Sequence, residues 1–259
     1  MAQSTFDRRR VNGPEESFPP MFDDEDDGGR GWTAKRCRGA EDIRPIFLQP
    51  GLVSQANGSA YIETENTKLA CAVYGPRQSK TTTYSERGRL NVEVKFAPFS
   101  CVRRRAPLRD AEDRAVAIAI HQSIVSSICL ELFPKSTIDV FIVVIENDGI
   151  EGCIASGSIA ASTALADAGI EMLGLVASCS AGVRGDEIRL DPVEKEVAAA
   201  DGTVILACMP ALSSVTNVYQ SGRVSAQGAM KCMELCQDRC IDVHAVMAQS
   251  LLSSRASMP

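Results

Sequence analysis

The segment NGSAYIETENTKLACAVYGPR at residues 57–77 contains the clearest structural signal in the chain. Small or apolar residues alternate with polar residues over 58–64, and the alternation resumes over 67–74. Between the two runs, Glu65 and Asn66 can supply the positive φ angle of a tight turn. The pattern predicts a β-hairpin whose second strand leaves through Gly75 and Pro76.

A second segment, ASGSIAASTALADAGIE at residues 155–171, predicts a helix built from small residues. Alanine and other small residues occupy most positions of its apolar face over 159–168. Gly169 follows at a place where helices commonly end. Because such a helix has little side-chain bulk, we expect it to approach a sheet very closely.

The composition is that of a protein with one substantial core. The chain has 259 residues, of which 45% are hydrophobic and 23% are charged. We expect one domain over 41–255 after a flexible charged tail over 1–40, which contains the basic run 8–10 and the acidic run 23–27. The tail is either a docking element or a solvated leader.

The net charge of -6 argues against a general nucleic-acid coat, which needs many Lys and Arg contacts to phosphates.

The ten cysteines are scattered through apolar segments, and no charged-then-apolar secretory leader precedes them. This usage predicts reduced thiols in the cytosol or the nucleus. The longest apolar runs, such as 138–145 and 204–209, are far shorter than the roughly 20 residues that cross a bilayer. We therefore expect no membrane span.

Other segments of the chain alternate between strand-like and helix-like patterns. Strands are expected at 46–53, 90–96, 138–145, 173–180, 188–190, 204–210 and 213–219, and helices at 110–133 and 226–252. We expect the first three or four strands to be antiparallel. The pattern predicts an α+β fold, a mixed-sheet sandwich with helices on the sheet faces.

Two acidic stretches are candidates for chemistry. The tight turn at 146–152 precedes the small-residue helix, where exposed N–H groups could bind an anion. Glu151 places a negative charge in that turn, however, and no arginine accompanies it. A second cluster follows the strand at 188–190, and we interpret it mainly as solvated loop charges: Asp191, Glu194, Glu196 and Asp201.

A row of three cysteines lies on one face of the last predicted helix: Cys232, Cys236 and Cys240. Three thiols in one row cannot close a tetrahedral zinc site, and neither His121 nor His244 is tied to them by spacing. We expect the three thiols to be buried, and we interpret His121 as a structural or surface residue. No metal and no cofactor are predicted.

Several stretches together carry a resemblance to a known family. They are GSAYIETENTKLACAVYGPR at 58–77, APFSC at 97–101, STALADAGIEM at 162–172, LDPVEKE at 190–196 and ILACMP at 205–210. Over about 44–252 the chain resembles the RNase PH family, and within it the ring subunits of the eukaryotic RNA exosome. The stretch RRRVNGPEES at 8–17 adds to the second likeness. The resemblance implies the RNase PH-like fold, also called ribosomal S5 domain 2-like.

The resemblance also has consequences for catalysis. Active members bind phosphate at a turn of Gly-Gly-Thr-Arg type and carry two aspartates six residues apart. Here the place of the arginine falls on Gly152, and the places of the aspartates fall on Val197 and Thr203. This implies a non-catalytic ring subunit that supports 3'→5' RNA processing and degradation, that of ribosomal RNA included.

Two alternatives remain open. One is an active phosphate-dependent 3'→5' exoribonuclease that uses Asp201, the one nearby acid, with arginines from a neighbouring subunit. The other is a free-standing binding protein that joins no ring.

Basic residues on both sides of one strand are the candidate RNA contact. They are Arg103, Arg104, Arg105 and Arg109 after it, and Lys80, Arg87 and Arg89 on or beside the preceding loop. In the family this side faces the central channel of the ring, so the resemblance implies contacts with RNA phosphates. The alternative is an exposed basic loop. The implied partners are other RNase PH-like exosome subunits in a six-membered ring, S1/KH cap proteins and RNA, with no membrane, in the nucleus, the nucleolus and the cytoplasm.

Overall fold

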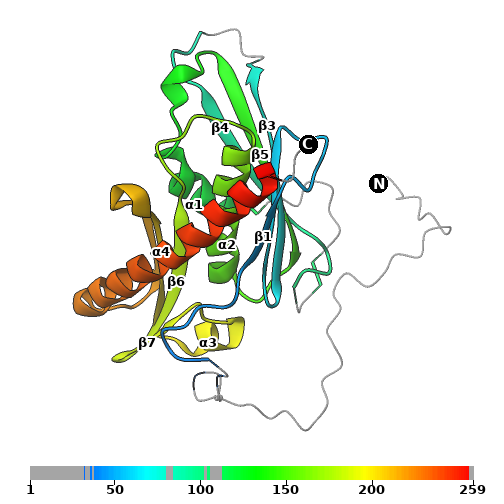
Figure 1. Cartoon of the computed structure of the whole chain (residues 1–259). Helices are drawn as coiled ribbons and strands as arrows, with labels where there is room; N and C mark the ends of the chain where they lie inside the picture. The colour runs from blue at the N-terminus through cyan, green and yellow to red at the C-terminus, as the bar shows by residue number, and fades with distance from the viewer. Residues whose placement is uncertain are drawn as a thin grey trace, which may run out of the picture.

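Two β-sheets enclose a pair of helices in this protein, and a long helix lies across the outer face of the second sheet (Figure 1). The computed structural model describes residues 32, 36, 38–79, 84–101, 104–105 and 113–256. Most of the predicted tail lies outside this range. The arrangement confirms the expected α+β sandwich of mixed sheets with helices on the sheet faces.

The first sheet contains the predicted hairpin. Its strands lie in the order β1-β2-β3-β5-β4 and are β1 (Phe47–Pro50), β2 (Gly58–Thr64), β3 (Thr67–Gln78), β4 (Arg89–Phe96) and β5 (Ser136–Glu146). β2 pairs antiparallel with β3 from Gly58 opposite Val73 to Thr64 opposite Thr67. Glu65 in the turn has a φ angle of 50°. The hairpin is therefore confirmed.

β4 differs from the antiparallel arrangement expected for the first strands. It pairs in parallel with β5, with Arg89 opposite Thr137 and Phe96 opposite Val144. Parallel neighbours need a crossover connection, which is usually helical. Here α1 (Arg114–Val125) lies in that connection, and it is shorter than the predicted helix at 110–133 because the chain turns into a 3-10 helix at Leu130–Leu132.

The second sheet is antiparallel and is built from the later part of the chain. Its strands lie in the order β7-β6-β8-β9 and are β6 (Ala177–Arg184), β7 (Glu187–Leu190), β8 (Gly202–Met209) and β9 (Ser214–Gly222). The strand predicted at 173–180 begins later because Leu173 donates its N–H to the carbonyl of Ser127 (2.7 Å), outside the sheet. That bond joins this segment to the end of α1 instead.

The helices occupy two layers. α1 and α2 (Ile150–Asp167) lie between the sheets, and α4 (Ala226–Ala256) packs on β6 and β8 and reaches β1. α2 begins at Ile150, before the predicted helical segment at 155–171, and a short helix α3 (Glu194–Ala199) forms where only a loop was expected. None of the described helices has the length and apolar character to cross a membrane.

Small residues let α2 fit between the sheets. All its side-chain positions from Gly152 to Leu165 are buried. At Gly58 on β2, an added Cβ would lie 2.2 Å from the backbone nitrogen of Ala168, just beyond α2. The predicted close approach of this helix to a sheet is therefore confirmed.

This contact predicts a large effect for one methyl group. We expect Gly58→Ala to lower the free energy of unfolding by about 2 kcal/mol or more, because two backbone segments must separate to admit it. Urea denaturation measures the change. Gly174→Ala is the matched control, since its added Cβ would lie 3.8 Å from the Met209 sulfur, an ordinary contact. Equal stability of the two variants would contradict the prediction.

Candidate functional site

The turn that leads into α2 lies against α3. Gly149 has a φ angle of 137° and is the residue before the helix, where a side chain would be strained. The carbonyl of Asp148 accepts a hydrogen bond from the N–H of Glu194 (2.9 Å). The two acidic stretches predicted from the sequence are therefore brought together.

Arg44 lies over Gly152, the position at which the sequence resemblance led us to expect the place of a phosphate-binding arginine. A Cβ added at Gly152 would lie 3.0 Å from Nη2 of Arg44. The Arg44 side chain comes from the segment before β1 and is only 1% exposed. A guanidinium is therefore present at this position, but it is supplied from another segment of the chain.

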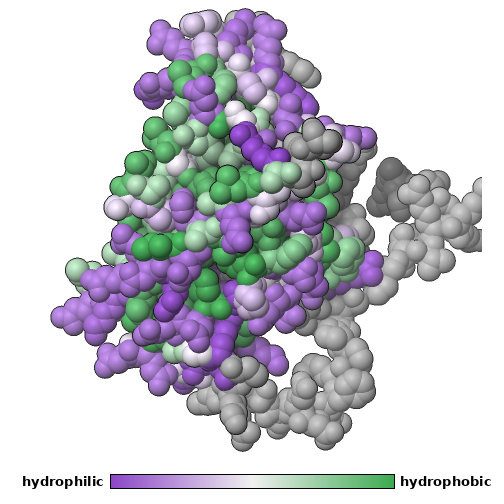
Figure 2. Space-filling model, viewed as in Figure 1, coloured by the Kyte–Doolittle hydropathy of each residue, from purple (hydrophilic) through white to green (hydrophobic). Residues whose placement is uncertain are grey.

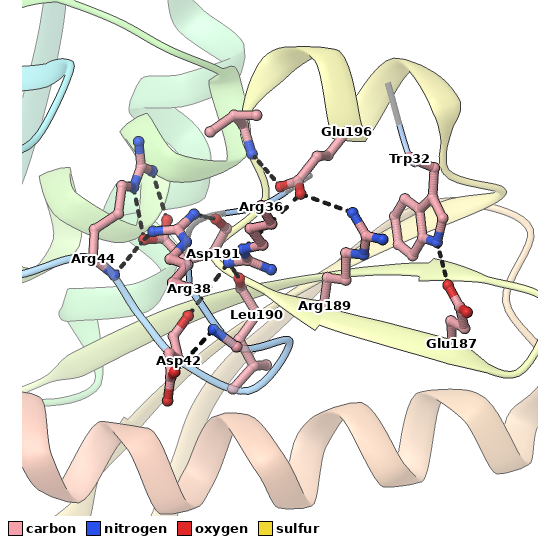
Figure 3. A network of polar contacts seen from close by, with 12 residues as sticks. Trp32, Arg36, Arg38, Asp42, Arg44, Glu187, Arg189, Leu190, Asp191 and Glu196 are labelled. Carbon is pink, nitrogen blue, oxygen red and sulfur yellow. Dashed lines mark hydrogen bonds and ion pairs between the residues drawn. The ribbon is translucent and has the colours of Figure 1, made fainter. Parts of the chain in front are cut away.

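Two carboxylates neutralise Arg44, and Figure 3 shows its bonds with one of them, Asp191. Nε and Nη2 donate to the two oxygens of Asp191 at 2.7 and 2.6 Å, and Nη1 lies 3.5 Å from Oδ2 of Asp148. Burial by itself would raise the pKa of Asp191, but the hydrogen bonds and charge of Arg44 hold that pKa below its ordinary value. Burial outweighs Arg44 at Asp148, whose pKa is raised. The guanidinium is thus committed to an internal ion pair.

The expected positions of the catalytic acids hold no carboxylate. Thr203 is 3% exposed, and its hydroxyl donates to Oε1 of Glu151 at 3.4 Å, beside the turn into α2. Val197 is half-buried on α3. The carboxylate of Asp201 accepts a hydrogen bond from the N–H of Gly185 (2.8 Å), in the turn between β6 and β7. Asp201 therefore caps a turn on the exposed surface.

The interpretation of the second acidic cluster as solvated loop charges was wrong for Asp191 and Glu196. Glu196 is 5% exposed and accepts hydrogen bonds from the N–H of Val193 and from Arg189, both at 3.1 Å. A short helix, α3, turns Glu196 inward. Its six residues were too few to give a helical period in the sequence.

Part of the predicted tail is attached to this network (Figure 3). Trp32 is 3% exposed, donates to Glu187 (2.6 Å) and lies 4.5 Å from the guanidinium of Arg189. Arg36 donates to the carbonyl of Leu190, and Arg38 donates to that of Asp191 (2.6 Å). Contacts with the domain thus begin before the predicted boundary at residue 41. Sequence reasoning missed them because they are polar and show no periodicity; the lone Trp32 in a charged segment was the available signal.

The candidate RNA-binding residues fall into two groups at opposite ends of β4. Arg87 and Arg89 lie at its start, whereas Arg104 and Arg105 follow its end. Seven residue steps of roughly 3.3 Å separate the strand ends by about 23 Å. Arg87 and Arg89 therefore do not share one patch with the later arginines. Lys80, Arg103 and Arg109 lie outside the described residues.

These four arginines also differ in what they contact. Arg105 pairs with Asp113 (3.2 Å), and its guanidinium lies 3.8 Å from the centre of the Phe96 ring, so it holds the chain after β4 in place. Arg87 pairs with Glu131 (2.8 Å) on the exposed surface. Arg89 and Arg104 are exposed. Those two remain the best placed to meet an external phosphate.

Comparisons with known proteins agree with the fold. The sequence model for the 3' exoribonuclease family, domain 1, of the RNase PH type, matches residues 42–171. The exosome complex component mtr3 of Schizosaccharomyces pombe is 36% identical over 254 residues, covering 96% of this chain and 97% of that protein. The chain belongs to the RNase PH family.

Two further relatives support the family assignment. The exosome complex component MTR3 of Homo sapiens is 35% identical over 265 residues, which cover 95% of this chain and 94% of that protein. Among solved structures, the Archaeoglobus fulgidus exosome with RNA bound to the active site has a chain that superposes with a TM-score of 0.69. That chain is 16% identical, and the match covers 80% of the present chain and 89% of the other. It therefore shares the RNase PH-like fold.

Five cysteines of this RNase PH family member lie together beneath α4 and are buried. Cys232, Cys236 and Cys240 on α4 face Cys179 on β6 and Cys208 on β8, and all five are at most 4% exposed. A hydrogen bond with Cys179 and burial raise the pKa of Cys236, and burial raises that of Cys232 to about 11. Among the described residues no group of three or more ligands is arranged to hold a metal ion.

The Arg44–Asp191 pair predicts a pH-dependent effect of Asp191→Asn. The folded-state pKa of Asp191 is depressed, so its stabilisation is present above about pH 4 and is lost as pH falls through the lower folded value. We expect the substitution to cost about 3–5 kcal/mol at pH 7, because it leaves a buried charge without its main partner. Urea unfolding from pH 7 to pH 2.5 should show this difference shrinking with acid. Asp238→Asn, on the exposed side of α4, is the control, and a loss independent of pH would contradict the ion-pair account.

Proposed function

We propose that this chain is a non-catalytic subunit of an RNA exosome core. In this function it fills one place in a six-membered ring of RNase PH-like subunits, beneath S1/KH cap proteins, and contacts RNA in the channel of the ring. It supports 3'→5' RNA processing and degradation in the nucleus, the nucleolus and the cytoplasm. The two relatives that cover nearly the whole chain are both named as exosome components.

The lack of catalysis is inferred mainly from the position of Arg44. Phosphorolysis needs a cation that can approach the phosphate and a group that can assist proton transfer. The guanidinium over Gly152 is paired with Asp191, and the residues at the acid positions are Val197 and Thr203. Asp201, the acid on which the alternative depends, is bonded to the N–H of Gly185.

Ring membership is supported by the surface of the chain. Hydrophobic residues gather in the middle of the face that carries α4 (Figure 2). A groove of about 490 Å³ runs between β1 and the last turns of α4. Apolar side chains are exposed on these two elements: Phe47, Ile241, Val246 and Leu252. An exposed apolar surface of this kind is typical of a protein that binds other chains.

Two experiments, a co-purification and an RNA-trimming assay, test the proposal. The chain, purified from cells under gentle conditions, should bring with it RNase PH-like and S1/KH proteins identified by mass spectrometry. Made alone and incubated with RNA and inorganic phosphate, it should release no nucleoside diphosphate. Release that is abolished by Asp201→Asn would establish the active exoribonuclease instead. Recovery of the chain alone would favour the free-standing binding protein.

The RNA contact makes a separate prediction. In the complex reassembled with its co-purifying subunits, Arg89→Ala together with Arg104→Ala should weaken RNA binding at low salt. The slope of log affinity against log salt concentration should become shallower by about one for each RNA phosphate that an arginine no longer neutralises. Arg184→Ala, an exposed arginine at the end of β6, is the matched control. Unchanged affinity and slope in the double variant would mean that these arginines are ordinary surface charges.

A further inference from the structure

A small cavity is lined by both members of the Arg44–Asp191 ion pair. Its volume is about 30 Å³, and its wall combines residues of the segment before β1, the end of β2, α2, β6 and α4. Thr64 from β2 and Ser180 from β6 add two hydroxyl groups to the polar part of the wall. The cavity thus lies where several elements of the fold meet.

Three polar atoms of residues in this wall have no hydrogen-bond partner among the described residues. They are Nη1 of Arg44 and the hydroxyl oxygens of Thr64 and Ser180. The three residues are 1%, 6% and 2% exposed. A buried polar group that gives up its bonds to solvent and gains none in return destabilises the fold. Three such atoms around one cavity therefore point to a bonding partner within it.

Other bonds set the positions of these three residues. The carboxylate of Asp191 accepts from Nε and Nη2 of Arg44 at 2.7 and 2.6 Å, which leaves Nη1 as the remaining nitrogen. Nη1 is 3.5 Å from Oδ2 of Asp148, an ion pair without a hydrogen bond. The carbonyl of Ser180 accepts from the N–H of Asp191 (2.7 Å), and Thr64 ends β2 at the hairpin turn. The unbonded atoms are thus held around the cavity.

Charge restricts what can occupy the cavity. The guanidinium of Arg44 repels a cation, and the carboxylates of Asp191 and Asp148 beside it repel an anion. A neutral molecule that can both donate and accept hydrogen bonds is therefore favoured, because the wall presents an N–H donor and two hydroxyl groups.

Size restricts the occupant further. A water molecule needs a cavity of at least about 10–15 Å³ and two to four polar partners. This cavity, with a volume of about 30 Å³ and three unbonded polar atoms, meets both conditions. It has no room for an organic ligand, since ligand pockets usually measure about 300–1,000 Å³.

We propose that this cavity binds an ordered water molecule, which accepts a hydrogen bond from Nη1 of Arg44 and forms hydrogen bonds with the hydroxyl groups of Thr64 and Ser180. The water joins the end of β2, the middle of β6 and the segment before β1 in one network. This inference is independent of the proposed function, because it concerns how the Arg44 ion pair is held within the chain.

A crystal structure of the unaltered full-length chain, alone or in its assembled complex, tests the site directly at a resolution that shows ordered water. We expect an electron-density peak at about 2.7–3.2 Å from Nη1 of Arg44 and from at least one of the hydroxyl oxygens of Thr64 and Ser180. An empty cavity would overturn the proposal. A cavity closed by a side chain, with both hydroxyl groups bonded to protein atoms, would overturn it as well.

Thr64→Val tests the same bond in solution. Valine has nearly the shape of threonine but cannot bond the water, so we expect the equilibrium constant for unfolding, measured with urea, to rise about threefold to tenfold. Thr67→Val is the matched control. Thr67 lies opposite Thr64 in the hairpin, is 0% exposed and also has an unbonded hydroxyl oxygen, but it does not line the cavity.

The two substitutions should therefore differ in sign. Replacing a buried hydroxyl group that has no partner removes a penalty, so Thr67→Val should leave the equilibrium constant for unfolding unchanged or lower it. If Thr64→Val proves as stable as Thr67→Val, the proposed water site is wrong. That result would leave the proposed function intact, because neither variant bears on ring membership.

Discussion

The fold depends on fitting α2 between two sheets. The helix contacts β2 and β3 on one side and β6 and β8 on the other, and α1 packs beside it. Large side chains at these positions would push the sheets apart, so the helix is built from glycine, alanine, serine and a few larger residues. The close contact at Gly58 is one result of this limit.

Around the turn before α2, ion pairs hold three segments of the chain together. The Arg44 guanidinium joins the segment before β1 to the end of β7 and to the turn after β5, through Asp191 and Asp148. A charge held in this way cannot move without breaking its contacts with both carboxylates, of which Asp191 also pairs with Arg38 (3.4 Å). The ion pairs that stabilise this region therefore also restrain the Arg44 guanidinium.

Periodicity and side-chain size made much of the fold predictable. The hairpin of β2 and β3 follows from alternation and a turn pair, and the closeness of α2 follows from its alanines. The parallel pairing of β4 with β5 was not predictable, because alternation in a strand does not reveal its neighbour. α3 was missed because six residues are too short to show a helical period. The start of one strand was also misplaced. Leu173 was predicted to begin a strand, but its N–H donates to the carbonyl of Ser127, outside the sheet.

The candidate site was predictable only in part. The residues that the resemblance places at the family's arginine and aspartate positions, Gly152, Val197 and Thr203, could be read from the sequence, since this expectation concerns residue identity. The roles of Arg44, Trp32 and Glu196 could not, because each depends on a partner more than 140 residues away or on a short helix. The basic residues looked like one group along the sequence, yet β4 separates them. The sequence alone did not show how far apart the two ends of β4 place these basic residues.

The sulfur atoms beneath α4 have a practical consequence. A thiol reacts with an alkylating reagent only as an accessible thiolate, and Cys236 and Cys240 are fully buried with raised pKa values. Labelling of these thiols therefore requires α4 to detach from the sheet. Their alkylation rate, followed by mass spectrometry, would report how often the helix opens and whether neighbouring subunits slow that opening. The native cysteines thus serve as a built-in probe of local unfolding.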